Sequence, residues 1–210
     1  MKTFLITTHH NKDTRHRYIK EHLKGVDYIP ILAPDWKMFR HTGLNDKQYK
    51  QQSLTLAYYQ IAQTALFLNL KEFTIMEDDL NITDWKMLDE LYENIPEHFD
   101  VCYLTRTDHN IASAMVKEYS HHFSKIVNNW WETPITHWSE RFARNFVFHI
   151  EQKLEEGLWL GHVDHELLQI NYKGSVNFYG SNFQIAQGIS TSKQPGLIGF
   201  EGSICNDLVK

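Results

Sequence analysis

Short apolar runs alternate with segments of helical periodicity along the first hundred residues of this chain. The apolar runs predict four strands, at residues 2–7, 26–32, 73–76 and 100–105. The periodic segments between them predict helices at residues 14–24, within 45–70, and from Thr83 or Asp84 through Leu91. Because strands that alternate with helices usually pair in parallel, we expect an α/β fold with a mostly parallel or mixed central sheet and helices on both faces.

The second half of the chain departs from this alternation. Residues 106–150 combine polar and aromatic segments, and they predict an insertion followed by a helix from about Ser139 to Glu155. The glycine-rich residues after Phe183 predict loops. Two predicted helices have an apolar face, made of Leu54, Ala57, Ile61, Ala65 and Leu68 in the first and of Phe142, Phe146 and Ile150 in the second.

The composition is that of a single globular domain. The chain has 210 residues, of which 42% are hydrophobic and 22% charged. A net charge of −5 argues against nucleic-acid binding, which normally uses clustered Lys and Arg. No apolar run approaches the roughly 18 residues that cross a bilayer, and the apolar start at residues 1–6 is too short for a signal-peptide core. We therefore expect a cytoplasmic protein, and the distant Cys102 and Cys205 predict no disulfide framework.

The predicted strand at residues 73–76 runs directly into three consecutive carboxylates, Glu77, Asp78 and Asp79. Three adjacent like charges repel one another, so a divalent cation is expected to share them, and hard oxygen ligands suit Mg²⁺ or Mn²⁺. Solvated acids that favour a following turn are the structural alternative. In a parallel sheet, ligands bind at the carboxyl ends of strands, where residues 7–10 and 35–36 are also expected. This convergence favours the metal site.

A second polar stretch, residues 157–168, contains two glycines, a Trp and an Asp flanked by histidines, followed by an apolar helix pattern. Asp164 at the start of that helix has two interpretations, which are compatible. It can be a helix N-cap, or it can be a carboxylate that accepts a proton from a substrate hydroxyl.

These features together resemble a known family of enzymes. The polar end of the first strand, Ser53-Leu54 in the long helix, Glu77-Asp78-Asp79, and the pattern Gly161-x-x-Asp164-x-Glu166-Leu167 are similar to the nucleotide-sugar-dependent glycosyltransferases of the GT-A fold. The similarity is greatest to the lipopolysaccharide-type transferases of family 25 and to the amino-terminal modules of chlorella virus glycosyltransferases. It implies a Rossmann-like domain with a nucleotide-binding part at about 1–105 and an acceptor-side part at about 106–210. The loop-rich end would suit a module cut from a longer polypeptide, in the host cytoplasm if viral.

The resemblance implies a metal-dependent inverting glycosyltransferase that moves a hexose or deoxyhexose, glucose- or rhamnose-like, from a UDP-sugar to a glycan or glycoprotein acceptor. Mn²⁺ or Mg²⁺ would be the cofactor. Asp79, with Asp78, would hold the metal, and Glu77 and Asp78 would meet the ribose or metal-bound water. Asp164 would be the general base. The remaining implied contacts are Thr7, Thr8 and His9 to the nucleotide, Arg15 or Arg17 to the diphosphate, and Asp35 and Ser53 to uracil and ribose.

The chain departs from the family pattern at three places. Glu77 replaces the usual first Asp of the acidic motif, and Val163 replaces an acid before Asp164. No histidine follows Gln184, although some family members supply a metal ligand from the segment that corresponds to residues 184–191 and closes over the diphosphate.

Other functions stay open. A nucleotidyltransferase would also combine an α/β sheet with acidic metal ligands, although residues 7–11 are not the Gly-rich, basic loop expected of one. A glycan-binding module would use tryptophans and a divalent ion but would need no base at Asp164. Zinc ligation by some of the 13 histidines is disfavoured, because no pair has the spacing of zinc hydrolases. Four tryptophans could stack on a sugar or pack the core: Trp130, Trp131, Trp138 and Trp159.

Overall fold

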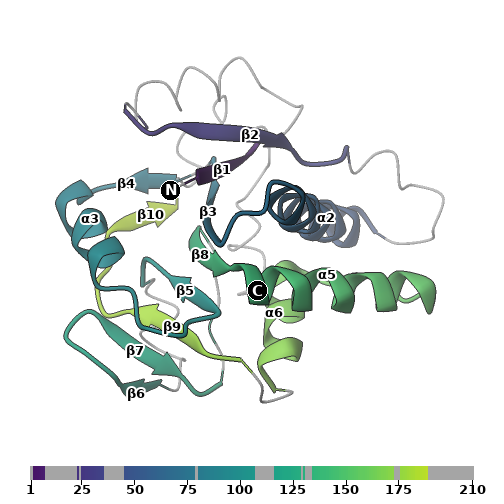
Figure 1. Cartoon of the computed structure of the whole chain (residues 1–210). Helices are drawn as coiled ribbons and strands as arrows, with labels where there is room; N and C mark the ends of the chain where they lie inside the picture. The colour runs from purple at the N-terminus through teal and green to yellow at the C-terminus, as the bar shows by residue number, and fades with distance from the viewer. Residues whose placement is uncertain are drawn as a thin grey trace.

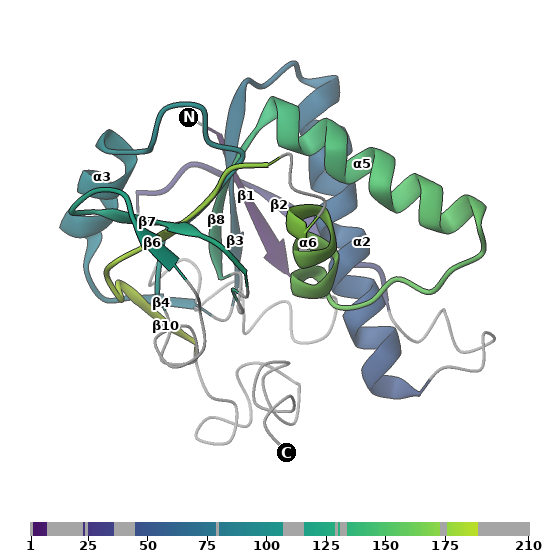
Figure 2. The same cartoon turned by 90° about the horizontal axis from the view of Figure 1, so that it is seen from below.

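The computed structural model describes residues 2–7, 23, 25–35, 45–78, 80–106, 116–128, 130, 134–172 and 176–188. Within these residues an eight-stranded mixed sheet forms the centre of the molecule (Figure 1). Figure 2 shows the sheet between α3 on one side and α2, α5 and α6 on the other. The predicted α/β architecture, with a mixed sheet and helices on both faces, is confirmed.

The strand order is β2-β1-β3-β8-β5-β9-β7-β6. The β1 strand pairs in parallel with β2 and β3, and β5 pairs in parallel with β9, whereas β8 is antiparallel to both β3 and β5. The bounds of the strands in this sheet are Lys2–Thr7 (β1), Tyr28–Leu32 (β2), Glu72–Glu77 (β3), Val101–Tyr103 (β5), Val116–Glu118 (β6), Phe123–Ile126 (β7), Ile135–Ser139 (β8) and Phe178–Ser181 (β9). A separate ribbon pairs β4 (Leu80–Ile82) with β10 (Ala186–Gly188).

The prediction of an insertion after residue 105 is wrong for much of that segment. It contains β6, β7 and β8, and β8 lies in the middle of the sheet between β3 and β5. The strand was missed because Thr136 and His137, at the centre of β8, are polar and suggest a surface segment. Both are fully buried in the structure. The Thr74 hydroxyl on β3 forms a 3.0 Å hydrogen bond with Nδ1 of His137.

The helices begin at residues whose side chains cap them. Asn45 accepts a hydrogen bond from the Gln48 amide, and the Gln48 side chain accepts one from the Asn45 amide, which forms a capping box. Asp84 and Ser139 accept bonds in the same way from Met87 and Phe142. The helix bounds are Asp46–Phe67 (α2), Trp85–Glu93 (α3), Glu140–Glu155 (α5) and Val163–Tyr172 (α6). The predicted helix at 14–24 lies outside the described residues except for Leu23.

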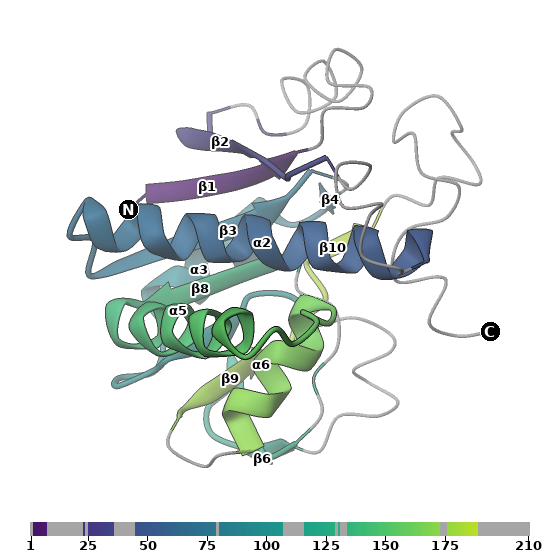
Figure 3. The ribbon, with the colours of Figure 1, turned by 90° about the vertical axis from the view of Figure 1, so that its right-hand side faces the viewer.

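Two hydrophobic cores lie on opposite faces of the sheet. The larger one is beneath α2 and α5, which run side by side over the sheet (Figure 3). Trp138 is at its centre, with ring centroids 4.8 Å from Phe142 and 5.0 Å from Phe146. The predicted apolar faces are buried there, except that Leu68 is exposed because α2 ends at Phe67.

Candidate functional site

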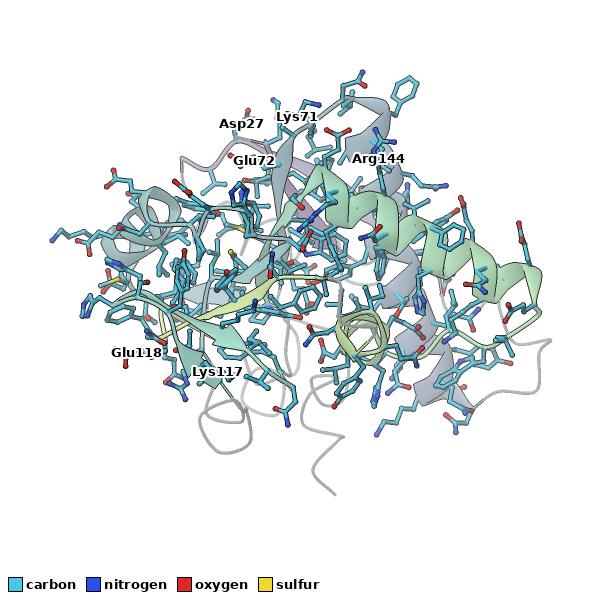
Figure 4. The ribbon with its side chains drawn as sticks, turned by 60° about the horizontal axis from the view of Figure 1, so that its bottom comes forward. Asp27, Lys71, Glu72, Lys117, Glu118 and Arg144 are labelled. Carbon is cyan, nitrogen blue, oxygen red and sulfur yellow. The ribbon has the colours of Figure 1, made fainter. Side chains whose placement is uncertain are left out.

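The carboxyl ends of five strands meet at one edge of the sheet. Since β3 and β5 are both antiparallel to β8, they run in the same direction as each other and as β1, β2 and β9. At the opposite edge, Lys2 pairs with Asp27 and Lys71 with Glu140 in exposed salt bridges. Figure 4 shows Asp27, Lys71 and Glu72 near one another at that opposite edge. The carboxyl edge is therefore the place to look for a ligand site.

Thr7 ends β1 at this edge, and its side chain is nearly inaccessible at 1% exposure. Its carbonyl accepts a 2.8 Å hydrogen bond from the Ala33 amide, which fixes the chain after β2 beside it. The Thr7 hydroxyl has no hydrogen-bond partner among the described residues. A buried hydroxyl without a partner costs about 1–3 kcal/mol. The Thr7 hydroxyl is therefore a candidate to form a hydrogen bond with a ligand. The other residues predicted to meet the nucleotide and diphosphate, Thr8, His9, Arg15 and Arg17, lie outside the described residues.

Ser53 has a role that the sequence did not indicate. Its hydroxyl donates a hydrogen bond to the carbonyl of Pro34, which joins α2 to the chain leaving β2. That chain leads to Asp35, which is partly buried. The structure thus places Ser53 and Asp35 at the same corner of the edge. It gives Ser53 a structural partner, and the predicted contact with ribose stays a prediction.

Glu77 and Asp78 lie at the end of β3, as predicted. Tyr58 from α2 donates a 2.9 Å hydrogen bond to Oε1 of Glu77, and the Glu77 amide donates to the Pro134 carbonyl. Asp78 is buried at 8% exposure. Asp79 lies outside the described residues. In the part of the chain that the structure describes, no three His, Cys, Asp or Glu side chains group as a metal site. The donors that are described, two adjacent carboxylates, suit a hard cation such as Mg²⁺ or Mn²⁺.

Asp164 is inside the first turn of α6, one residue after the helix begins, so it is not the N-cap. His162 precedes the helix and caps it, because its Nδ1 atom accepts a 3.3 Å hydrogen bond from the Asp164 amide. The His162 carbonyl accepts the first helical bonds, from the amides of His165 and Glu166. The Nδ1 atom of His162 lies 3.3 Å from Oδ2 of Asp164, and both side chains are buried, at 2% and 1% exposure. The structure therefore holds a carboxylate and an imidazole together, away from solvent.

Electrostatic effects connect this pair to neighbouring strands. Burial lowers the pKa of His162, but the carboxylates of Asp164 and Glu77 offset this, and the pKa is raised above 6.5. The pKa of Tyr103, at the end of β5, is raised well above 10.0 by burial and by the charge of Asp164. The start of α6 is thus close to the ends of β3 and β5. Asp164 and Glu77 both act on His162, and the prediction that they belong to one site stays a prediction.

Glu166 holds this part of the chain in place. Its buried carboxylate accepts hydrogen bonds from His149 Nε2 at 2.8 Å, from Lys153 Nζ at 2.8 and 2.9 Å, and from the Gly161 amide at 2.7 Å. The Gly161 carbonyl accepts a 2.7 Å bond from Thr55 on α2. A Cβ atom at Gly161 would lie 3.2 Å from Oε1 of Glu166, so the glycine leaves room for this bond. The glycine and glutamate of the motif therefore fix the loop that carries His162 and Asp164.

Sequence reasoning missed three contributors to this site. Tyr58, Thr55 and His162 were not singled out for it, although Tyr58 and Thr55 lie on the buried face of α2. Buried polar residues within an amphipathic helix were the available signal, because such groups need partners.

The structure places three of the four tryptophans that could stack on a sugar or pack the core. Trp130 and Trp138 are in the core, Trp159 is 41% exposed, and Trp131 lies outside the described residues.

Comparison with known proteins identifies the class of fold. No protein-family model matches the chain, and no curated protein matches its sequence. Among solved structures, it is similar to UDP-glucose pyrophosphorylase complexed with UDP-glucose, with a TM-score of 0.51, 8% identity, and 99% and 98% of the two chains covered. It is also similar to LicC, the CTP:phosphocholine cytidylyltransferase of Streptococcus pneumoniae, with a TM-score of 0.50, 11% identity and coverage of 100% and 99%. The shared feature is a Rossmann-like nucleotide-binding α/β fold.

A glycosyltransferase involved in the glycosylation of the major capsid of PBCV-1 also matches, with a TM-score of 0.43 and 11% identity. The match covers 72% of this chain and 66% of that one, so the chain spans slightly less than two thirds of that protein.

The helices of the structure also bear on whether the chain crosses a membrane. Within the described ranges, no helix combines the length and apolar character needed to cross a bilayer.

Proposed function

We propose that this protein is a metal-dependent inverting glycosyltransferase that uses a UDP-sugar as donor and a glycan or glycoprotein as acceptor. The observation that carries the proposal is the proximity of two acidic groups from separate elements. Glu77 and Asp78 end β3, Asp164 begins α6, and the same face of α2 touches both places, because Thr55 bonds the Gly161 carbonyl before α6 and Tyr58, one turn further along, bonds Glu77. Two separated carboxylate groups suit a reaction that needs one for the leaving group and one for the nucleophile.

The acidic end of β3 is the proposed donor site. Asp79 and Asp78 would hold Mg²⁺ or Mn²⁺, which would supply charge neutralisation for the departing diphosphate. Glu77, which Tyr58 orients, would meet the ribose or a metal-bound water. Thr7 would contact the nucleotide with its unpartnered hydroxyl, and Asp35 and Ser53 lie on the side of the edge proposed for uracil and ribose.

Asp164 is the proposed base. Its carboxylate would take the proton from an acceptor hydroxyl as that oxygen bonds to the anomeric carbon of the sugar. The bond between the anomeric carbon and the diphosphate oxygen breaks with its electron pair going to the leaving diphosphate, so one displacement inverts the centre. His162 would hold Asp164 in one orientation, since the two side chains are buried in contact.

The test is release of sugar from a panel of nucleotide-sugar donors, with and without EDTA, by the wild type and by Asp164→Asn. We expect EDTA-sensitive release by the wild type and a loss of at least about 100-fold in the variant, the scale of general-base catalysis. Asp89→Asn, a change of an exposed aspartate on α3, is the matched control and should retain activity. Full transfer activity in folded Asp164→Asn would show that Asp164 is not the base.

A nucleotidyltransferase is the second candidate, favoured by the fold shared over nearly the whole chain with a cytidylyltransferase and a pyrophosphorylase. The leaving groups separate the two reactions. A glycosyltransferase releases nucleoside diphosphate, whereas a nucleotidyltransferase releases pyrophosphate from a nucleoside triphosphate. Binding of glycans with neither product would instead indicate a binding module.

A further inference from the structure

Arg106 lies at the carboxyl edge of the sheet, three residues after β5, and its backbone is held from two sides. The Arg106 amide donates a 2.8 Å hydrogen bond to the Phe183 carbonyl, and two residues earlier the Leu104 amide donates to the Ile135 carbonyl at 3.0 Å. Between them, the Thr105 hydroxyl accepts bonds from the amides of Ile185 and Ala186, both at 3.2 Å. The position of the Arg106 backbone is therefore fixed.

Arg106 is partly buried, and one nitrogen of its guanidinium has no partner among the described residues. Its Nε atom is buried with no hydrogen bond, and in the described part of the chain no carboxylate pairs with it. The other arginines of known surroundings behave differently. Arg141 binds Asp100 at 2.8 and 2.6 Å, and Arg144 binds Glu140 at 2.6 Å. Burial of a charged donor without a partner is costly, so an anion that reaches Arg106 would gain its full hydrogen-bonding capacity.

Arg106 is placed to share a ligand with the acidic end of β3. Only β8 separates β3 from β5, so the ends of these two strands are roughly 10 Å apart, two strand spacings. The β4–β10 ribbon connects the two places, because β4 begins two residues after Asp78 and β10 begins at Ala186, whose amide is bonded to Thr105. A group the size of a sugar diphosphate can span that distance.

We propose that Arg106 is an anion-binding residue that contacts the diphosphate of the nucleotide-sugar donor. This inference rests on the proposed function and adds a cationic partner for the diphosphate of the donor. A planar guanidinium can give two parallel hydrogen bonds to a phosphate. The same chemistry would bind a carboxylate on the transferred sugar, and the experiment below separates these two sources.

The first test needs no nucleotide. Inorganic pyrophosphate is titrated into the wild type, Arg106→Gln and Arg144→Gln, and the thermal midpoint is followed. Arg144 is exposed on the outer side of α5 (Figure 4), so its variant removes the same charge away from the site. We expect stabilisation by pyrophosphate in the wild type and Arg144→Gln, and loss of at least half of that shift in Arg106→Gln. Equal shifts in all three proteins, or no shift in the wild type, would overturn the proposal.

The second test identifies the source of the anion. Affinities of uridine, UDP, UDP-glucose and UDP-glucuronic acid are measured for the same proteins. A roughly tenfold loss in Arg106→Gln for all three diphosphates, with uridine unchanged, supports contact with the diphosphate. A loss for UDP-glucuronic acid alone supports an anion site for the sugar carboxylate and overturns the diphosphate assignment.

Failure of this inference is distinguishable from failure of the proposed function. If the wild type binds UDP-sugars and Arg106→Gln binds them equally well, only the role of Arg106 is wrong. If the wild type binds no nucleotide but pyrophosphate still stabilises it through Arg106, the anion site stands and the donor assignment is wrong. The ligand-free midpoint of Arg106→Gln is expected to equal or exceed that of the wild type, since a buried donor without a partner among the described residues has been removed. A lower midpoint would indicate a structural role.

Discussion

Nδ1 of His162 and Oδ2 of Asp164 lie 3.3 Å apart at the start of α6, and both side chains are nearly excluded from solvent. This contact makes the stability of the fold depend on pH. The pKa of His162 in the folded protein is above its ordinary value of 6.5, because Asp164 and Glu77 outweigh burial, and Lys47 opposes them only weakly. A histidine whose pKa is higher in the folded than in the unfolded protein stabilises the fold fully at pH values below the unfolded pKa. This contribution is lost as the pH rises through the folded pKa.

The first prediction is therefore a loss of stability at mildly alkaline pH. The free energy of unfolding by urea should fall from pH 6.5 upward until His162 is neutral, and His162→Asn should flatten this dependence. His98→Asn is the control, since His98 is exposed and its positive φ of 58° suits asparagine as well. An unchanged pH profile in folded His162→Asn would contradict the assignment.

The second prediction concerns Glu166, whose carboxylate is fully buried. Replacement by glutamine removes the charge that balances Lys153 and His149 in the interior. Because breaking one partner of a buried ion pair costs about 3–5 kcal/mol, Glu166→Gln should lose most of the protein's stability. Glu155→Gln, at an exposed position on the same helix α5 as Lys153, should change the free energy of unfolding by less than about 0.5 kcal/mol.

Glu166 also predicts sensitivity to acid. Burial raises its pKa, but the hydrogen bonds from His149, Lys153 and the Gly161 amide lower it by more. The pKa of Glu166 is therefore below its ordinary value of 4.5. A carboxyl group whose pKa is lower in the folded than in the unfolded protein stabilises the fold at pH values above the unfolded pKa. This contribution is lost as the pH falls through the folded pKa. Below about pH 4.5, the stability of the wild type should fall more steeply than that of Glu166→Gln. Parallel acid profiles for the two proteins would show that Glu166 is not ionised in the fold.

The third prediction concerns Tyr58, which is fully buried and donates to Glu77. Tyr58→Phe removes a hydrogen bond to a charged group, which costs about 1.5–3 kcal/mol, and takes away one of the contacts that orient Glu77. Under the proposed function, Mn²⁺-dependent affinity for UDP should fall as well. The neighbouring Tyr59 offers a matched control, because its hydroxyl makes a 2.9 Å bond to exposed Glu151. Tyr59→Phe should leave UDP affinity unchanged, and an equal effect of both variants would argue against a donor-site role for Tyr58.

The elements predicted correctly are those in which local pattern and burial agree. The strand at β1, the acidic end of β3 and the apolar face of α5 were all readable, because period and composition point the same way. The strand β8 was not, since His137 looks like a surface residue until Thr74 and the stacked ring of Phe99, 5.2 Å away, are placed beside it. Partners that lie on other strands have no signal in the local sequence.

The same limit applies to the candidate site. Asp164 and Glu77 stood out because their own neighbours in sequence are informative. The significance of Arg106 depends on a buried Nε atom that has no hydrogen-bond partner among the described residues, which is a property of three-dimensional packing. The resemblance implied Arg15 or Arg17 as the diphosphate ligand, and both lie outside the described residues.

The last prediction concerns the contact between Gly180 and Trp130 in the core. A Cβ atom at Gly180 would lie 2.2 Å from the Trp130 ring, which is buried and packs on Tyr103 at 5.6 Å between ring centroids. Gly180→Ala should therefore destabilise the protein by about 1–3 kcal/mol or more, because the indole must move. Trp130→Phe alone should also destabilise, through the cavity it leaves.

If the indole is the obstacle, the double variant should be more stable than the sum of the two single effects predicts, by at least about 0.5 kcal/mol in urea unfolding. Gly157→Ala is the control, since a Cβ atom there meets nothing within 4 Å and only its φ of 68° is unfavourable. Strict additivity of the Gly180 and Trp130 changes would contradict direct contact. Under the proposed function, Gly180→Ala is also expected to lower transfer activity at a temperature where the protein is still folded, because Trp130 packs on Tyr103, whose pKa is raised by burial and by the charge of Asp164.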